Sequence, residues 1–196
     1  MWNKNTIEWI DIELTSFCNI KCPGCLRQEM HDKVGPLLNK SYIKFEDLKK
    51  WIPKGYLPNL KIINFCGSVD EPTTHPEFID IVDYFLDFSD VNVATNGSTR
   101  TIKFWEDLGR RKLSVFFGID GTDQKSLEKY RIGSNFKKVQ ENYRAFIGAG
   151  GNATWQFIVF DHNEHLIKEA ENMSKVEGFK RFRKIYSHRT GSGEVK

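Results

Sequence analysis

Cys18-Asn19-Ile20-Lys21-Cys22-Pro23-Gly24-Cys25 is the stretch that decides how the rest of this sequence is interpreted. It holds three of the chain's four cysteines within eight residues. A disulfide framework spreads its cysteines along the chain to close loops, whereas a tight group on one loop is typical of a metal site. Three thiolates can hold three irons of a 4Fe–4S cluster, which leaves the fourth iron open to another ligand. The spacing therefore predicts a metal-binding loop in a reducing compartment.

Two other interpretations of the cysteine group stay open at this point. A structural zinc site would need a fourth ligand, and His31 is the nearest candidate after the loop. A chance grouping of core cysteines is the plainer alternative.

Composition narrows the classes of protein to which the chain can belong. Its 196 residues are enough for one large domain or two small ones, and 39% hydrophobic with 28% charged residues excludes a disordered chain. The formal net charge of +3 is too small to indicate a nucleic-acid partner. No apolar run approaches the roughly 20 residues of a membrane span, and the first eight residues show no secretory signal. We expect a cytoplasmic protein with no membrane contact.

Short apolar runs alternate with amphipathic stretches along most of the chain. The expected strands cover residues 7–14, 60–65, 91–95, 113–119, 154–160 and 180–185. The expected helices cover residues 45–51, 76–88, 101–108, 123–130, 136–149 and 164–175. Strict alternation predicts an α/β fold with a parallel sheet, either open and doubly wound or closed toward a barrel. We expect one domain over 1–188, an inserted loop at 26–41 and a flexible tail at 189–196.

The cysteine loop resembles the cluster loop of radical S-adenosylmethionine (radical SAM) enzymes. That resemblance implies a partial (β/α)6 barrel, similar to part of a TIM barrel. It also implies two cofactors, a 4Fe–4S cluster on Cys18, Cys22 and Cys25, and S-adenosylmethionine (SAM) on the open iron. In this family an electron from the cluster cleaves SAM to methionine and a 5′-deoxyadenosyl radical, which abstracts hydrogen from a substrate.

The loop after the second expected strand resembles the family's Gly-Gly-Glu-Pro segment, which meets the SAM ammonium group. Here it reads Gly67-Ser68-Val69-Asp70-Glu71-Pro72, with one glycine kept and two residues inserted. The resemblance implies Gly67 and either Asp70 or Glu71 as SAM contacts. An acidic helix start is the alternative interpretation of the two acids. The neighbouring Cys66 is expected to be a small buried residue at the end of a strand, and a fourth thiol near the cluster is the alternative.

Thr95-Asn96-Gly97, after the third expected strand, resembles the family's Thr-Asn-Gly, whose polar side chains lie near the ribose and carboxylate of SAM. The resemblance implies Thr95 and Asn96 as SAM contacts. Asn-Gly is also a common turn pair, so this segment alone does not decide between a turn and a site.

Asp120 ends a segment that resembles the family's Ser-Ile-Asp-Gly, with Gly118 in place of the small polar residue. Arg131 follows in a segment similar to one whose arginine pairs with the SAM carboxylate. A charge-assisted contact of that kind is strong, although a solvated surface arginine is nearly as good an interpretation. Both residues are candidate SAM contacts.

Val159 and Asn163 belong to a segment that resembles the family's fifth strand and the asparagine after it. By resemblance, Val159 brackets adenine and Asn163 contacts the nucleoside. Without that context the segment is a buried strand.

The expected function is a metal-binding oxidoreductase of the radical SAM type, acting on a peptide, a protein or a small metabolite. A flavodoxin or ferredoxin is the expected electron donor. A glycyl-radical activating enzyme of the same superfamily is one alternative. A non-catalytic zinc or iron–sulfur module is the other.

Overall fold

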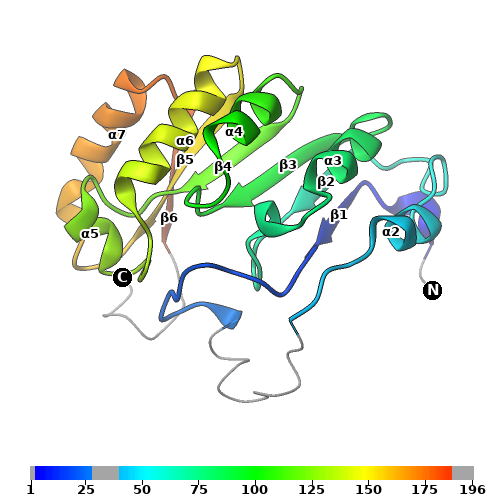
Figure 1. Ribbon diagram of the computed structural model, residues 1–196, viewed down its shortest axis with the longest axis horizontal. Coiled ribbons are helices and arrows are strands. Elements are labelled where there is room, and N and C mark those ends of the chain that lie inside the picture. The colour runs from blue at the N-terminus through cyan, green and yellow to red at the C-terminus, as the bar shows by residue number, and fades with distance from the viewer. Residues whose placement is uncertain (1–2, 28–39, 187–196) are drawn as a thin grey trace.

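The computed structural model describes residues 3–27 and 40–186, and its sheet has six parallel strands in chain order (Figure 1). The strands are β1 (Trp9–Ile12), β2 (Ile62–Phe65), β3 (Asp90–Thr95), β4 (Ser114–Gly118), β5 (Asn152–Val159) and β6 (Arg181–Tyr186). The helices are α2 (Phe45–Trp51), α3 (Phe78–Leu86), α4 (Ile102–Gly109), α5 (Gln124–Glu128), α6 (Phe136–Gly148) and α7 (Ile167–Val176). Short 3-10 turns are η1 (Lys4–Thr6), η3 (Pro72–Thr74) and η4 (Glu164–Leu166).

Strand order distinguishes the two architectures that alternation alone left open. A doubly wound sheet reverses its strand order and carries helices on both faces. Here the order never reverses, and α3, α4, α6 and α7 lie on one face of the sheet (Figure 1). Among the described residues β1 and β6 do not pair. The fold is therefore the expected partial (β/α)6 barrel.

The expected helices and strands are present, with ends that differ by a few residues. The helix expected from Pro76 begins two residues later, at Phe78, and is preceded by the separate 3-10 turn Pro72–Thr74. The helix expected at 164–175 is divided into η4 and α7. Most of the expected inserted loop at 26–41 and all of the expected tail at 189–196 lie outside the described residues. No described helix has the length and hydrophobicity of a membrane span.

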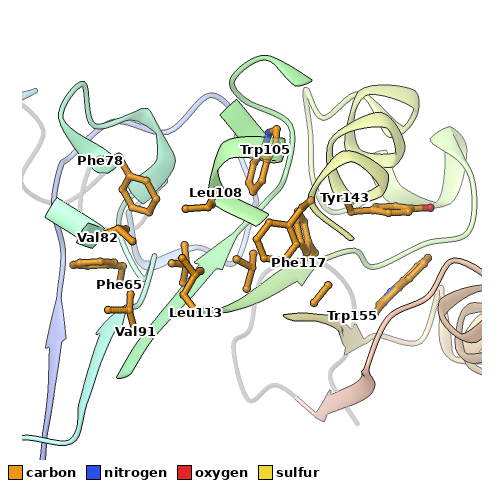
Figure 2. Packing of buried hydrophobic residues seen from close by; sticks show 14 of the residues in the cluster. Phe65, Phe78, Val82, Val91, Trp105, Leu108, Leu113, Phe117, Tyr143 and Trp155 are labelled. Atoms are coloured by element: carbon orange, nitrogen blue, oxygen red, sulfur yellow. The ribbon is translucent and has the colours of Figure 1, made fainter. Parts of the chain in front are cut away.

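Aromatic side chains fill the layer between the sheet and its helices (Figure 2). The ring of Phe117, on β4, lies 5.2 Å from the ring of Trp105 and 5.8 Å from that of Phe146, between centroids. Burial of these large rings is a main source of stability. Their burial also determines which residues of each strand face the helices. The alternate residues of the strand then point to the opposite face of the sheet.

That other face carries a row of polar side chains. Asn64 donates to Asp11 (2.8 Å) and accepts from Asn92 (2.9 Å), and Asn152 donates to Ser114 (2.8 Å). Strand register aligns the five residues across β1 to β5. A closed barrel fills its interior with apolar layers, whereas this open one presents a polar face. One layer closer to the carboxyl ends of the strands, the same face becomes the wall of a cavity.

Candidate active site

A cavity of about 270 Å³ lies at the carboxyl ends of the strands, where parallel α/β sheets collect their functional residues. Its wall includes all four cysteines and parts of the loops that follow β1, β2 and β3. Nine of the twelve expected site residues line it. They are Cys18, Cys22, Cys25, Gly67, Asp70, Glu71, Thr95, Asn96 and Arg131.

The cysteine loop is held in place mainly by backbone hydrogen bonds to other parts of the chain. Lys21 N–H donates to the Ile132 carbonyl (2.9 Å), and the Phe17 carbonyl accepts from Glu71 N–H (2.8 Å). Arg27 Nε donates to the Ser16 carbonyl (3.2 Å). These contacts join the loop to the segments after β2 and α5, so its position depends on the whole fold.

The cysteines are free thiols, and each is half-buried in the cavity wall. Burial raises the pKa of Cys18 to about 11 and that of Cys22 to about 12. Neither thiol is ionised at neutral pH, so a metal must displace the thiol proton when it binds. Cys25 Sγ lies 3.6 Å from the Ser68 carbonyl, and Asn96 Nδ2 lies 3.8 Å from Cys18 Sγ.

The cavity and its donors fit a cluster with a further polar ligand beside it. Three thiols line one cavity, and a 4Fe–4S cluster binds each of its thiolates through a different iron. Within the described parts of the chain, no three His, Cys, Asp or Glu side chains gather around a point as a single metal ion requires. Asp70, in the same wall, has a buried carboxyl oxygen without a donor among the described residues.

Glu71 is a fully engaged carboxylate beneath the cavity. Its Oε1 accepts from the hydroxyls of Thr73 (2.6 Å) and Thr95 (2.7 Å), and its Oε2 accepts from Asn96 N–H (2.7 Å). Burial raises the pKa of Glu71, and these donors oppose that effect. Glu71 thus joins the loop after β2 to the end of β3, and its hydrogen bonds occupy both oxygens.

Asp70 differs from its neighbour because only one of its oxygens is engaged. Oδ2 accepts from Thr15 N–H (3.0 Å), whereas Oδ1 is the buried oxygen without a donor. The side chain is 6% exposed. Of the two acids, Asp70 has the free acceptor toward a ligand.

Asn96 ties the end of β3 to the cysteine loop. Its Nδ2 donates to Asn19 Oδ1 (2.9 Å), and its Oδ1 accepts from Ser98 N–H (2.8 Å). Asn19 Nδ2 in turn donates to Ser98 Oγ (2.8 Å). The Asn-Gly pair is therefore a turn and a wall of the cavity at once.

Gly97→Ala is expected to destabilise the protein by about 1–3 kcal/mol. Gly97 has a φ of +70°, and an added Cβ would lie 2.9 Å from Phe117 Cδ1 in the core. Gly148→Ala is the matched control, because nothing lies within 4 Å of its Cβ position. Urea unfolding measures both, and equal stability of the two variants would contradict the prediction.

Arg131 is buried beside the cavity and paired with Asp120. Its Nε lies 2.8 Å from Asp120 Oδ2, and Asp120 Oδ1 accepts from Ile158 N–H (2.7 Å). Burial opposes the charge of Arg131, but Asp120 outweighs it and keeps the pKa of Arg131 above its ordinary value. A Cβ on Gly118 would overlap the guanidinium group, which explains why glycine replaces the family's small polar residue there. The surface-arginine interpretation is wrong.

Three expected site residues do not line the cavity. Asp120 lies behind Arg131. Asn163 is fully buried and donates to the carbonyls of Asp120 and Ile158, both at 2.9 Å. Val159 is 3% exposed and belongs to the aromatic core, while its neighbour Ile158 lines the cavity. Ile158 and not Val159 faces the cavity, because alternate residues of a strand face opposite sides of the sheet.

Sequence reasoning missed Glu13, which does not line the cavity but binds three groups that do. Glu13 accepts from the Cys66 thiol (2.8 Å) and from Ser68 N–H (2.9 Å) through Oε1, and from Val69 N–H (3.2 Å) through Oε2. Cys66 is half-buried in the cavity wall, not enclosed in the core as expected. A glutamate at the end of an apolar strand, where the strand leaves the sheet, was the available signal.

The family model of the radical SAM superfamily matches residues 12–173 of the chain, which is well over half of it. Two curated relatives match shorter parts. The tungsten-containing aldehyde ferredoxin oxidoreductase cofactor-modifying protein of Pyrococcus furiosus is 30% identical over 118 residues, which are 58% of this chain and 31% of the relative. The 7,8-dihydro-6-hydroxymethylpterin dimethyltransferase of Methanocaldococcus jannaschii is 29% identical over 129 residues, 63% of this chain and 24% of the relative.

Solved structures share the fold. Streptococcus suis SuiB superposes with a TM-score of 0.76 at 16% identity, over 96% of this chain and 42% of that chain. The anSMEcpe enzyme, solved with bound AdoMet and the Cp18Cys peptide, superposes with a TM-score of 0.71 at 18% identity, over 95% of this chain and 54% of that one. The chain thus spans about a third or less of the curated relatives and about half of these structures.

Proposed function

The chain belongs to the radical SAM superfamily, whose enzymes use a 4Fe–4S cluster and SAM, and we propose that Cys18, Cys22 and Cys25 hold the cluster. The observation that carries this proposal is that three free thiols line one cavity together with a buried, unengaged carboxyl oxygen of Asp70. When bound there, the cluster would supply the electron for the reductive cleavage of SAM, which is the chemistry of this superfamily.

The chain's own residues bind and orient SAM in this proposal. Asp70 accepts from the ammonium group beside the backbone of Gly67, and Arg131 faces the carboxylate with the guanidinium nitrogens that Asp120 leaves free. Thr95 and Asn96 line the side toward the ribose. A radical needs protection from water, and a recessed cavity provides it.

Three further residues position the residues of this wall. Glu71 is a positioning residue, because its oxygens hold Thr95 and the Asn96 backbone. Asp120 positions Arg131. Asn163 positions the ends of β4 and β5 through two carbonyls, so that Ile158 provides the apolar contact to adenine.

The substrate class we propose is a peptide, a protein or a small metabolite. SuiB has been solved with the precursor peptide SuiA, and the curated relatives carry names that refer to a cofactor and to a pterin. A flavodoxin or ferredoxin supplies the electron in a reducing compartment, the cytoplasm, which suits thiolate ligands.

We expect anaerobically reconstituted protein to form 5′-deoxyadenosine and methionine from SAM when dithionite is added. Liquid chromatography measures both products, and iron and sulfide analysis measures cluster content. Omitting dithionite is the control and should leave SAM intact. Protein that takes up zinc and no iron, or that carries a cluster and leaves SAM intact, would contradict the proposal.

A further inference from the structure

Strand β6 turns two arginines toward the face of the sheet that lies away from the helices, here called the inner face. Phe182 marks the other face, because its ring lies 6.0 Å from that of Phe157 in the aromatic core. Alternate residues of a strand face opposite sides, so Arg181, Arg183 and Ile185 share the inner face. Both arginines are exposed there.

The two arginines lie beside the cavity rather than within it. Strand register places Arg183 next to Gln156, and Ile185 next to Ile158. Gln156, Ile158 and Ile185 all line the cavity. Arg183 therefore adjoins the cavity wall, and Arg181 lies one inner-face position further from it.

Both arginines are without an acidic partner in the described part of the chain. Elsewhere Arg110, Arg111 and Arg144 are each paired with an aspartate or a glutamate. A guanidinium group matches a carboxylate in charge and in the geometry of its hydrogen bonds. The inner face of β6 thus offers two positive charges to a negatively charged ligand.

β6 is also an edge strand of the sheet (Figure 1). Among the described residues it pairs with β5 on one side and with no strand on the other. Backbone groups along such an edge can pair with an extended peptide, which is a recurring mode of peptide recognition. Side chains on one face of a strand repeat about every 6.6 Å, so alternate side chains of that peptide match the spacing of the two arginines.

We propose that the edge of β6 binds an extended acidic peptide, with two acidic residues that are separated by one residue and lie beside Arg181 and Arg183. The inference deepens the proposed function, on which it rests for the role of the peptide as the substrate. The next inner-face residue of the peptide then lies beside Ile185, in the cavity wall. The acids would thus select the peptide, and the residue two positions away is the one presented to the cavity.

Charges on an edge strand also discourage unwanted pairing with other sheets. That role needs charge but no particular face, so Lys184 would serve it as well, since it is exposed on the other face of β6. Recognition of two spaced acids depends on the inner face alone. Lys184→Gln is therefore the matched control for Arg181→Gln and Arg183→Gln.

Fluorescence anisotropy of two labelled peptides tests the proposal on reconstituted protein at low salt, where exposed charges act most strongly. One peptide has two glutamates separated by a valine and flanked by threonines, and the other has the same composition with the glutamates adjacent. Adjacent side chains of an extended peptide point to opposite faces, so the wild type should bind the spaced peptide about fivefold more tightly. The double variant Arg181→Gln, Arg183→Gln should lose this preference, and Lys184→Gln should keep it.

Three results would overturn the peptide site: equal binding of both peptides by the wild type, a preference kept by the double variant, or a preference lost in Lys184→Gln. Inorganic phosphate or a short labelled DNA strand that binds more tightly than the spaced peptide would overturn it in favour of another anion.

SAM cleavage under dithionite separates this inference from the proposed function. The double variant leaves the cavity lining unchanged, so it should cleave SAM as the wild type does, which also shows that it is folded. Wild type that cleaves SAM but does not prefer the spaced peptide overturns the peptide site alone. Wild type that prefers the spaced peptide but leaves SAM intact overturns the proposed function, and with it the role of the peptide as substrate.

Discussion

Cys22→Ala is expected to abolish cluster assembly and SAM cleavage together. The loop offers three thiols for three irons, so losing one leaves the cluster with two protein ligands. Iron content, the visible absorption of the cluster and 5′-deoxyadenosine formation measure the effect.

Cys66→Ala is the matched control for that variant. Cys66 lines the same cavity and is also a free thiol, but it donates to Glu13 from the end of β2 instead of belonging to the loop. Its removal should leave the iron content unchanged. Full iron content in Cys22→Ala, or loss of iron in Cys66→Ala, would contradict the assignment of the three ligands.

Arg131→Met is expected to destabilise the protein by about 3–5 kcal/mol, because it leaves the charge of a fully buried Asp120 without its partner. Methionine is similar in length, so lost packing contributes little. The double variant with Asp120→Asn should recover part of the loss, since the unpaired charge is then absent.

Lys129→Met controls for removing a positive charge from the same turn, because Lys129 is exposed. Urea unfolding of the four proteins gives the comparison. An Arg131→Met variant within about 0.5 kcal/mol of the wild type, which is the usual range for surface substitutions, would show that the pair does not hold this side of the cavity.

The fold was largely predictable because its signals are local. Alternating apolar runs and helix-like stretches gave the order of elements, and N-terminal caps such as Thr101, Asp123 and Asn135 start α4, α5 and α6 where the pattern begins. The choice between a doubly wound sheet and a partial barrel depends on the order of the strands. Periodicity carries no information on strand order, and only the family resemblance predicted the partial barrel.

The cavity was predictable where one loop carries its own chemistry, as at the three cysteines. The cavity was less predictable where contacts with distant parts of the chain determine which of two adjacent residues faces it. Asp70 and Glu71 are adjacent acids, and the nearby N–H and O–H donors engage both oxygens of Glu71 but only one oxygen of Asp70. Val159 and Ile158 belong to a continuous apolar run, so the sequence could not show which one faces the cavity.

The partners of two charged residues, Glu13 and Arg131, could not be predicted from the sequence either. Glu13 accepts a hydrogen bond from Cys66 because the pairing of β1 with β2 places the loop after β2 beside it. Arg131 can be buried because Asp120 pairs with its charge and because Gly118 has no side chain to occupy the space of the guanidinium group. Such long-range pairings do not follow from spacing along the chain.

Low-temperature EPR of the reconstituted, dithionite-reduced protein, recorded with and without SAM, tests the central claim most directly. A reduced 4Fe–4S signal that shifts when SAM is added is the predicted result, because SAM then binds the iron that the three cysteines leave open. A cluster signal that is the same with and without SAM, or protein that assembles no cluster, would contradict it.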